Sequence, residues 1–197
     1  MSHEKQIQEF DVVIVGAGLA GLYQLLKLRQ LGLTAVIIEK ADQVGGTWHW
    51  NRYPGARCDI PSLEYSYQFD EDLQQEWNWS EKYSAQPEIL EYINHVADKY
   101  ELRDDINFEE EVTSAVFDES ASKWSINTSK GQYSSKFCIF ATGCLSVPNK
   151  PDFQGLENFE GQILQTSTWP QEEQDFSGKK VAIIGTGSSA IQSIPLI

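Results

Sequence analysis

The chain has 197 residues, enough to bury one sizeable apolar core, and 41% of them are hydrophobic, an ordinary share for a globular protein. Its formal charge of -14 at pH 7 disfavours nucleic acid and anionic membranes as partners, because their phosphates would repel it. Three cysteines, Cys58, Cys138 and Cys144, have neither metal-ligand spacing nor the even number of a disulfide framework, which favours a reducing cytoplasm.

The N-terminal residues 1–6 contain no apolar signal region. No apolar run anywhere in the chain approaches the ~20 residues that span a bilayer. We therefore expect a cytoplasmic protein with no membrane partner.

Residues 10–39 have the pattern of a strand-helix-strand unit. The apolar run at 10–15 predicts a buried parallel strand. Leucines at helical spacing predict a helix over 19–31, which Gly32 ends. Residues 34–39 predict the next strand.

The turn between this strand and helix carries a dinucleotide-binding fingerprint. Gly16 permits a tight turn, Gly18 lets a pyrophosphate approach the backbone, and Gly21 lets helix and strand pack closely. The helix N-terminus supplies N–H donors and partial positive charge for that phosphate. Glu39, at the end of the second strand, is placed to accept hydrogen bonds from ribose hydroxyls. The alternative, a tight glycine turn without a ligand, explains neither the helix nor the acid.

The middle of the chain combines an aromatic loop region with one helix. Residues 44–62 are rich in Gly, Pro, Trp and Tyr and are too aromatic for a flexible tether, so an ordered loop is expected. Residues 63–81 continue without a clear period. Pro87 begins a helix that runs to Tyr100, since proline suits the first helical turn.

Three β segments follow, at residues 108–117, 123–128 and 133–140. Their lengths and short connections predict an antiparallel meander whose last strand re-enters the main sheet. Residues 148–170 form a connection that contains proline and glycine. A new strand is expected from Lys179.

A second fingerprint follows that strand, at Gly185, Gly187 and Ala190. Two such sites most simply hold a bound flavin and a diffusing nicotinamide cofactor. Because the sequence stops seven residues after Ala190, it reads as the first part of a two-nucleotide oxidoreductase. For this chain alone we expect poor stability or oligomerisation, and its oligomeric state is open.

One long stretch discriminates between the nucleotide enzymes. Residues 45–59, GGTWHWNRYPGARCD, resemble the flavin-binding loop of the Baeyer–Villiger monooxygenases almost residue for residue. Residues 141–143 are similar to that family's hinge between its flavin and NADPH domains, and the second fingerprint is similar to its NADPH site. The resemblance covers most of residues 10–197 and identifies the N-terminal part of such an enzyme.

The resemblance implies an α/β fold: a Rossmann-type FAD-binding domain with an antiparallel β-meander, and the start of a second, NADPH-binding domain. The corresponding ranges are 1–145 for the first domain, 146–178 for a linker and 179–197 for the second. It implies FAD and NADPH as cofactors, with O2 and a small-molecule ketone as substrates. One oxygen atom would be inserted into the ketone to give an ester or a lactone.

Asp59 matches the family's active-site aspartate, and the resemblance implies that it orients an arginine that lies beyond residue 197. The alternative is an aspartate that caps the turn before Ile60 and Pro61. Of two loop arginines that could offset flavin phosphates, Arg57 is expected to be solvated, and no role is assigned to Arg52. No metal site is expected. The expected cofactor contacts are Gly16, Gly18, Gly21, Glu39, Lys40, Gly46, Thr47, Trp48, Asp59, Tyr65, Val112, Ala141, Thr142, Gly143, Gly185, Gly187 and Ala190.

One position departs from the family's pattern Phe-x-Gly-x-x-x-His-x-x-x-Trp-Pro. Phe159, Gly161, Trp169 and Pro170 match it, but Gln165 stands at the histidine. Glutamine can donate and accept hydrogen bonds but cannot carry a charge. In this family the segment helps to couple the NADPH domain to catalysis, so the resemblance implies that any part of that coupling that needs a charged imidazole is lost.

Two alternatives stay open. A flavin monooxygenase that oxidises nitrogen or sulfur shares both fingerprints, although the loop through Asp59 favours the Baeyer–Villiger side. A truncated, non-catalytic FAD-binding fragment or partner subunit belongs to another class of function. Ketone turnover, compared with amine or sulfide turnover, separates the enzymes from each other.

Overall fold

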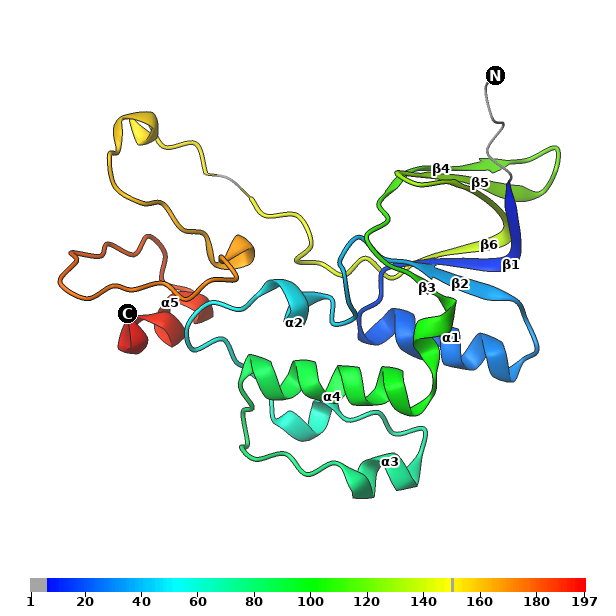
Figure 1. The fold of residues 1–197 in the computed structure, drawn as a ribbon, viewed down its shortest axis with the longest axis horizontal. Helices are drawn as coiled ribbons and strands as arrows, with labels where there is room; N and C mark the ends of the chain where they lie inside the picture. Colours follow the sequence, from blue (N-terminus) through cyan, green and yellow to red (C-terminus); the bar gives the residue numbers. More distant parts are fainter. Residues whose placement is uncertain (1–6, 150) are drawn as a thin grey trace. The chain divides into compact units, whose positions relative to one another are not determined.

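A computed structural model describes residues 7–149 and 151–197 of the chain. The chain divides into two compact units, one made of Met1–His49 and Ile93–Cys144, the other of Trp50–Tyr92 and Leu145–Ile197. The first unit contains a β-sheet, and the second consists of short helices and loops (Figure 1).

A six-stranded mixed sheet forms the centre of the first unit, in the order β3-β2-β1-β6-β5-β4 (Figure 1). β1, β2, β3 and β6 run parallel, and β4 and β5 join β6 as an antiparallel meander. The expected α/β fold, with a meander whose last strand re-enters the parallel sheet, is confirmed. The strands are β1 (Gln8–Val15), β2 (Ala35–Ile38), β3 (Ile106–Asn107), β4 (Val112–Asp118), β5 (Lys123–Thr128) and β6 (Gln132–Phe140).

The two faces of this sheet are covered by different elements. Helix α1 (Leu19–Gln30) packs on one face through buried leucines at helical spacing. On the other face the meander closes over β1 and β2 (Figure 1). Each apolar side chain buried in these layers stabilises the fold by about 1.5–3 kcal/mol. The cluster beneath the meander consists of Val13, Val36, Ile38, Ile126 and Tyr133.

The carboxyl ends of β1 and β2 lie side by side. Val15 pairs with Ile38 in the parallel register, so the turn after β1 and the residue after β2 meet at one edge of the sheet. Ligands of open α/β sheets bind outside the carboxyl ends of the strands. The fold therefore brings Gly16 and Glu39 together, although 22 residues lie between them in sequence.

The second unit is organised around aromatic side chains. Tyr92 lies within 5.1–6.1 Å, centroid to centroid, of the rings of Tyr67, Trp77 and Trp79. Its hydroxyl accepts a 2.8 Å hydrogen bond from the Tyr67 backbone N–H. Burial raises the pKa of both Tyr67 and Tyr92. This cluster orders the segment that has no clear sequence period.

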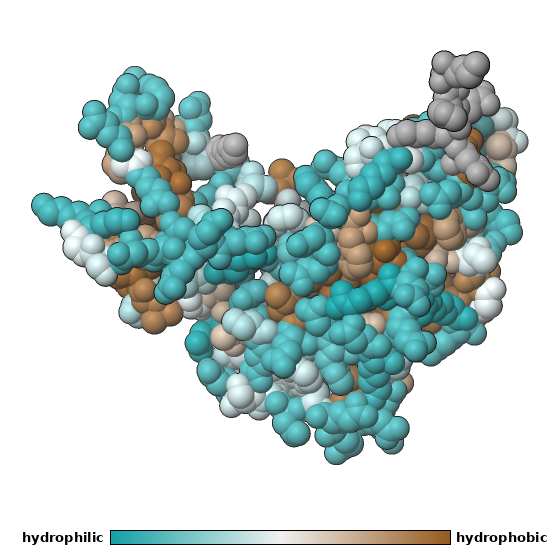
Figure 2. Space-filling view, viewed as in Figure 1, coloured by the Kyte–Doolittle hydropathy of each residue, from teal (hydrophilic) through white to brown (hydrophobic). Residues whose placement is uncertain are grey.

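The remaining helices are short, apart from α4 (Gln86–Lys99), which has residues in both units. They are α2 (Thr47–Trp50), η1 (Ser62–Tyr65), α3 (Glu71–Glu76), η2 (Leu102–Asp105), η3 (Leu156–Asn158), η4 (Thr166–Thr168), α5 (Ser188–Ser193) and η5 (Ile194–Leu196). Around the last two, Ile184, Ile191 and Leu196 are exposed, and apolar atoms are visible over this C-terminal segment (Figure 2). Among residues 7–149 and 151–197, no helix is long and apolar enough to cross a membrane.

The structure differs from the sequence-based prediction in several elements, among them the short helix α2 within the expected loop and the three described next. Helix α3 was not predicted, although Asp70 accepts a 3.1 Å hydrogen bond from the Leu73 N–H as an N-cap. The strand expected at 108–117 begins only at Val112, as β4, because residues 108–111 form an irregular crossover after β3 in which Glu109 has a φ of 55°. The strand expected from Lys179 is irregular backbone, because no described segment pairs with it and an isolated strand is unstable.

Candidate nucleotide-binding site

Two of the three glycines in the first fingerprint are required by packing within the chain. Gly16 has a φ of 106°, and a Cβ there would lie 2.6 Å from the carbonyl oxygen of Ala141. A Cβ on Gly21 would lie 1.9 Å from the carbonyl oxygen of Gly16. These two positions let the turn and helix α1 pack closely against each other and against the end of β6.

Gly18 differs, because packing within the chain does not exclude a side chain there. Its φ is -82°, and a Cβ would lie 3.5 Å from Gly46 Cα, an ordinary contact distance. Gly18 is the N-cap of α1, and no side chain caps this helix in the described part of the chain. The space that Gly18 leaves at the helix N-terminus thus fits a group from outside the chain.

A second glycine turn lies against the first. Gly46 has a φ of 53°, and a Cβ there would lie 3.0 Å from Gly18 Cα. The Gly45 N–H donates to the Ala17 carbonyl at 3.1 Å. Two backbone segments without side chains therefore meet at the positive end of α1, an arrangement that fits a pyrophosphate.

Glu39 is anchored beside this turn. It is only 7% exposed, and its carboxylate accepts from the Ala17 N–H at 2.6 Å and from the Ala41 N–H at 2.8 Å. A carboxylate offers about four acceptor positions, so two backbone donors leave capacity for ribose hydroxyls. The same contacts hold the glycine turn in place.

The backbone of Glu39 is tied to the segment that joins β3 to β4. Its N–H donates to the Asn107 carbonyl at 2.9 Å, and its own carbonyl accepts from the Glu110 N–H at 2.9 Å. Next to it, Lys40 forms an exposed ion pair of 2.8 Å with Glu111. Val112, the first residue of β4, follows Glu110 by two positions. Backbone hydrogen bonds and an ion pair thus connect three residues expected to contact the cofactor, Glu39, Lys40 and Val112, although they come from distant parts of the sequence.

The predicted hinge lies at the same edge of the sheet. The Ala141 N–H donates to the Val15 carbonyl at 2.9 Å, and Gly143 has a φ of 69°. The first unit contains twelve of the expected contacts: Gly16, Gly18, Gly21, Glu39, Lys40, Gly46, Thr47, Trp48, Val112, Ala141, Thr142 and Gly143. The other five, Asp59, Tyr65, Gly185, Gly187 and Ala190, belong to the second unit.

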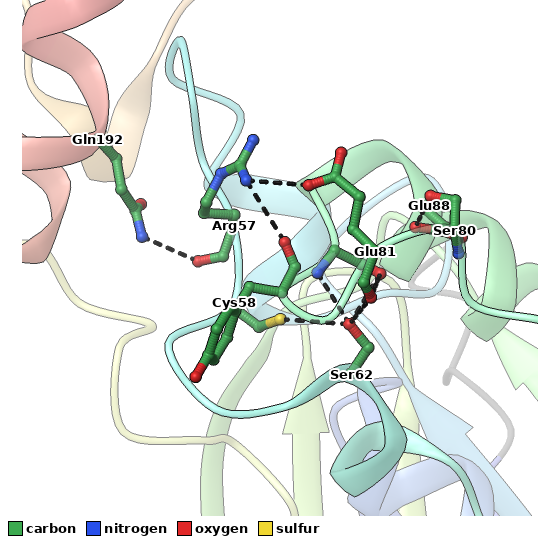
Figure 3. Close-up of polar contacts among 9 residues, drawn as sticks. Arg57, Cys58, Ser62, Ser80, Glu81, Glu88 and Gln192 are labelled. Carbon is green, nitrogen blue, oxygen red and sulfur yellow. Dashed lines mark hydrogen bonds and ion pairs between the residues drawn. The ribbon is translucent and has the colours of Figure 1, made fainter.

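In the second unit, the Asp59 loop is closed at both ends by segment 81–86. The Cys58 N–H donates to the Ser84 carbonyl at 3.1 Å, and the Ser62 N–H donates to the Lys82 carbonyl at 2.8 Å. The Ser62 hydroxyl donates to the Glu81 carbonyl at 2.8 Å and accepts from the Ser84 N–H at 2.8 Å (Figure 3). Neither serine was singled out by the sequence, because buried hydroxyl pairs have no local pattern.

Asp59 itself is exposed at the tip of this loop. Its side chain makes no hydrogen bond with the residues that the structure describes. Beside it, the Cys58 thiol is buried and lies 3.9 Å from the Ser62 hydroxyl, as expected of a packed cysteine. Arg57 is exposed and pairs with Glu81 at 3.2 Å (Figure 3).

The second fingerprint forms its turn and the first part of its helix. Gly185 has a φ of 119°, and Gly187 is the N-cap of α5. The side chain of Gln192 accepts from the Tyr53 hydroxyl at 2.9 Å. It also donates to the Arg57 carbonyl at 3.1 Å (Figure 3). Helix α5 is thereby connected to the Asp59 loop.

Gln165, at the position of the family's histidine, has a partner in the second unit. Its side-chain amide donates to the Asn149 carbonyl at 2.9 Å. A neutral imidazole could donate a similar hydrogen bond, so only a role that requires positive charge is lost.

The sequence did not indicate a second buried acid near the site, which is buried even more deeply than Glu39. Of three consecutive glutamates at 109–111, only Glu110 is buried, at 4% exposed. Its partners Thr128 and Tyr133 follow it by 18 and 23 residues, so no local spacing indicates the cluster.

Comparison with known proteins gives a consistent result. Residues 13–193 match the model of a family described as pyridine nucleotide-disulphide oxidoreductase. Acetone monooxygenase (methyl acetate-forming) of Gordonia sp. (strain TY-5) is 47% identical over 188 residues, covering 95% of this chain and 35% of that protein. Phenazine N-monooxygenase PhzNO1 of Lysobacter antibioticus is 43% identical, covering 94% of this chain and 34% of its own length.

A solved structure, an oxidized steroid monooxygenase bound to NADP, superimposes with a TM-score of 0.91 at 55% identity. It covers 96% of this chain, which in turn covers 36% of it. Proteins named Baeyer-Villiger monooxygenase are also among the relatives, which confirms the resemblance seen in the sequence. The chain spans about a third of the length of the curated relatives it matches.

Proposed function

The chain belongs to the pyridine nucleotide-disulphide oxidoreductase family, and from this premise we propose that the protein is an FAD- and NADPH-dependent monooxygenase. It inserts one oxygen atom of O2 into a ketone to give an ester or a lactone. NADPH supplies two electrons, and the second oxygen atom leaves as water. The name of the acetone monooxygenase relative, methyl acetate-forming, supports a ketone-to-ester reaction.

One observation carries the FAD part of this proposal. Position 18 is a glycine although packing within the chain would allow a side chain there, and it faces Gly46 beside the anchored carboxylate of Glu39. A pyrophosphate at the N-terminus of α1, with its ribose hydroxyls at Glu39, uses all three features. FAD, when bound, supplies the electron transfer and the reaction with O2 that side chains cannot perform.

The residues of this chain have three tasks in the proposed reaction. Gly18 and Gly46 admit the pyrophosphate, Gly16 and Gly21 let the turn and α1 pack closely enough to form its site, and Glu39 orients the ribose. Residues 141–143, with Lys40, Thr47, Trp48, Tyr65 and Val112, complete the flavin contacts. Asp59 acts as the active-site aspartate, and its exposed carboxylate, with no described partner of its own, is available to orient a cation. Gly185, Gly187 and Ala190 hold the NADPH phosphates, whose negative charge the N-terminus of a helix favours.

Oxygenation of nitrogen is the second candidate, because the phenazine N-monooxygenase relative is 43% identical. The test is direct: flavin-loaded protein is supplied with NADPH, O2 and either a cyclic ketone or a tertiary amine. Formation of a lactone supports the first proposal, and formation of an N-oxide replaces it with the second. Retention of flavin without consumption of NADPH for either substrate supports a non-catalytic FAD-binding role instead.

Binding is tested before turnover. FAD is added to the purified chain, excess is removed on a desalting column, and the absorbance spectrum is recorded. We expect retained bands at about 370 and about 450 nm, because the flavin has its own chromophore. Loss of all flavin on the column would contradict binding by this chain. Parallel assays with NADH and NADPH test the proposed preference for NADPH.

We further propose that the protein works in the cytoplasm and binds neither nucleic acid nor membranes. Its charge of -14 disfavours polyanions, and the three cysteines of the described chain are all free, as a reducing compartment requires.

A further inference from the structure

A buried carboxylate lies next to the proposed ribose site and has no assigned role. Glu110 is 4% exposed and borders the apolar cluster beneath the meander. Its carboxylate accepts from the Tyr133 hydroxyl at 3.0 and 3.1 Å and from the hydroxyl of Thr128. The donors that the structure gives it are thus neutral hydroxyl groups on β5 and β6.

An apolar residue would occupy this position at lower cost, since burial of a carboxylate without a paired cation is unfavourable. The surroundings are arranged to keep the donors in place. The Tyr133 hydroxyl accepts a 2.8 Å hydrogen bond from the Asn107 side chain, which orients its proton toward Glu110. Burial, and next the hydrogen bond to Glu110, raise the pKa of Tyr133 to about 12, so its hydroxyl remains a donor even above pH 10, where a free tyrosine is ionised.

The crossover at residues 107–112 connects this cluster to Glu39. Its backbone is in an uncommon conformation at Glu109, with a φ of 55°, which a non-glycine residue adopts only when its surroundings hold it. The Glu110 N–H donates to the Glu39 carbonyl at 2.9 Å, and the Glu109 N–H donates to the Ala41 carbonyl at 2.8 Å. The Glu39 N–H donates back to the Asn107 carbonyl at 2.9 Å. Movement of the crossover would therefore displace Glu39.

We propose that Glu110 is a positioning residue for the adenosine end of the dinucleotide site: bound by Tyr133 and Thr128, it fixes the crossover that orients Glu39 and places Val112. This inference rests on the proposed function in one respect, the identity of the ligand as a dinucleotide. The link from Glu110 to Glu39 exists in the protein without ligand and is measurable there.

The ligand-free test is amide hydrogen exchange resolved by residue. Glu110→Gln keeps the side-chain volume and replaces one acceptor oxygen with an amide that cannot accept. We expect exchange of the Ala17 and Ala41 amides to accelerate at least about fivefold, because both donate to the Glu39 carboxylate, and one hydrogen bond to a charged group is worth about that factor or more. Glu119→Gln, at an exposed carboxylate of the same unit, is the matched control and should change neither rate.

If Glu110 only stabilised the fold, the pattern of amide exchange rates in Glu110→Gln would differ. Exchange would accelerate at Thr128 and Tyr133, or across the unit as a whole, without a selective change at Ala17. Exchange of the Leu25 amide in α1 provides the reference for overall destabilisation. If Ala17 and Ala41 exchange as in the unchanged chain relative to that reference, the proposal is overturned. Should Glu110→Gln fail to fold, Tyr133→Phe removes one donor, retains the ring packing and carries the same expectation.

FAD titration provides the second readout. Glu110→Gln should raise the Kd for FAD about fivefold, from the same loss of one charge-assisted contact. In a Glu39→Ala background the same substitution should change the Kd less than about twofold, because the carboxylate to be positioned is gone. An equal loss in both backgrounds would overturn the positioning role. Failure of the unchanged chain to bind FAD would count against the proposed function alone, and the exchange data would still decide the link to Glu39.

Discussion

Replacement of Gly18 with alanine separates ligand binding from folding at the first glycine turn. The added Cβ would lie 3.5 Å from Gly46 Cα, an ordinary contact, and the φ of -82° suits any residue. Alanine is a poorer N-cap than glycine by up to about 1 kcal/mol. It also lowers the entropy of the unfolded chain, which stabilises by about 0.4–1 kcal/mol. The free energy of unfolding should therefore change by less than about 1 kcal/mol.

Binding of FAD should respond much more strongly to the same methyl group. It would occupy the space where the pyrophosphate approaches the helix N-terminus, so we expect at least about a tenfold rise in Kd, equivalent to about 1.4 kcal/mol. Two other alanine substitutions serve as controls. Gly21→Ala places a Cβ 1.9 Å from the Gly16 carbonyl oxygen and should destabilise the fold severely. Gly32→Ala, with a φ of 73° and open space around it, should cost about 1 kcal/mol without a specific effect on FAD.

The assay combines urea denaturation of the ligand-free chain with a fluorescence titration of FAD. The reasoning about Gly18 is refuted if Gly18→Ala binds FAD as tightly as the unchanged chain. It is equally refuted if this substitution costs as much stability as Gly21→Ala, since the glycine would then be a packing requirement.

Three further predictions concern other parts of the molecule. Ser62→Ala should reduce the free energy of unfolding by about 1–3 kcal/mol, because the Ser84 N–H and the Glu81 carbonyl lose a buried partner. Urea denaturation measures this free energy. Ser120→Ala, on an exposed turn, is the control and should have little effect on it. The pKa of Tyr133 is raised to about 12 in the folded chain, so its contribution to stability is complete below about pH 10 and is lost as the pH rises toward 12. Denaturation midpoints measured across that range should fall less steeply in Tyr133→Phe, and an unchanged slope would contradict this. Gln165→His should leave NADPH consumption unchanged at pH 8.5, where a neutral imidazole can donate to the Asn149 carbonyl as glutamine does. Below about pH 6.5, where the imidazole gains a charge, the substitution should alter NADPH consumption. An effect of the substitution that is flat with pH would contradict a role for that charge.

Local patterns were sufficient for the elements whose residues follow a regular period. The apolar runs before Gly16 and Glu39 and the leucines between them are typical of β1, β2 and α1, and these elements formed within one or two residues of the prediction. Such patterns work because each buried side chain of a strand or helix repeats with the geometry of that element. The glycine fingerprint and the loop at residues 45–59 likewise identify the family from sequence alone.

The contacts that depend on long-range packing were decided only by the tertiary structure. Three adjacent glutamates at 109–111 are equivalent in sequence, yet Glu110 alone is buried, because the crossover turns it toward Thr128 and Tyr133. The apolar stretch at 181–184 has a strand pattern but remains irregular, because a strand is stabilised by partners and no described segment pairs with it. Sequence by itself therefore determined the period of each element and the chemistry of the glycine turns. Burial of a single charge and pairing of a single strand depended on residues far away in the chain, which only the folded structure brings into contact.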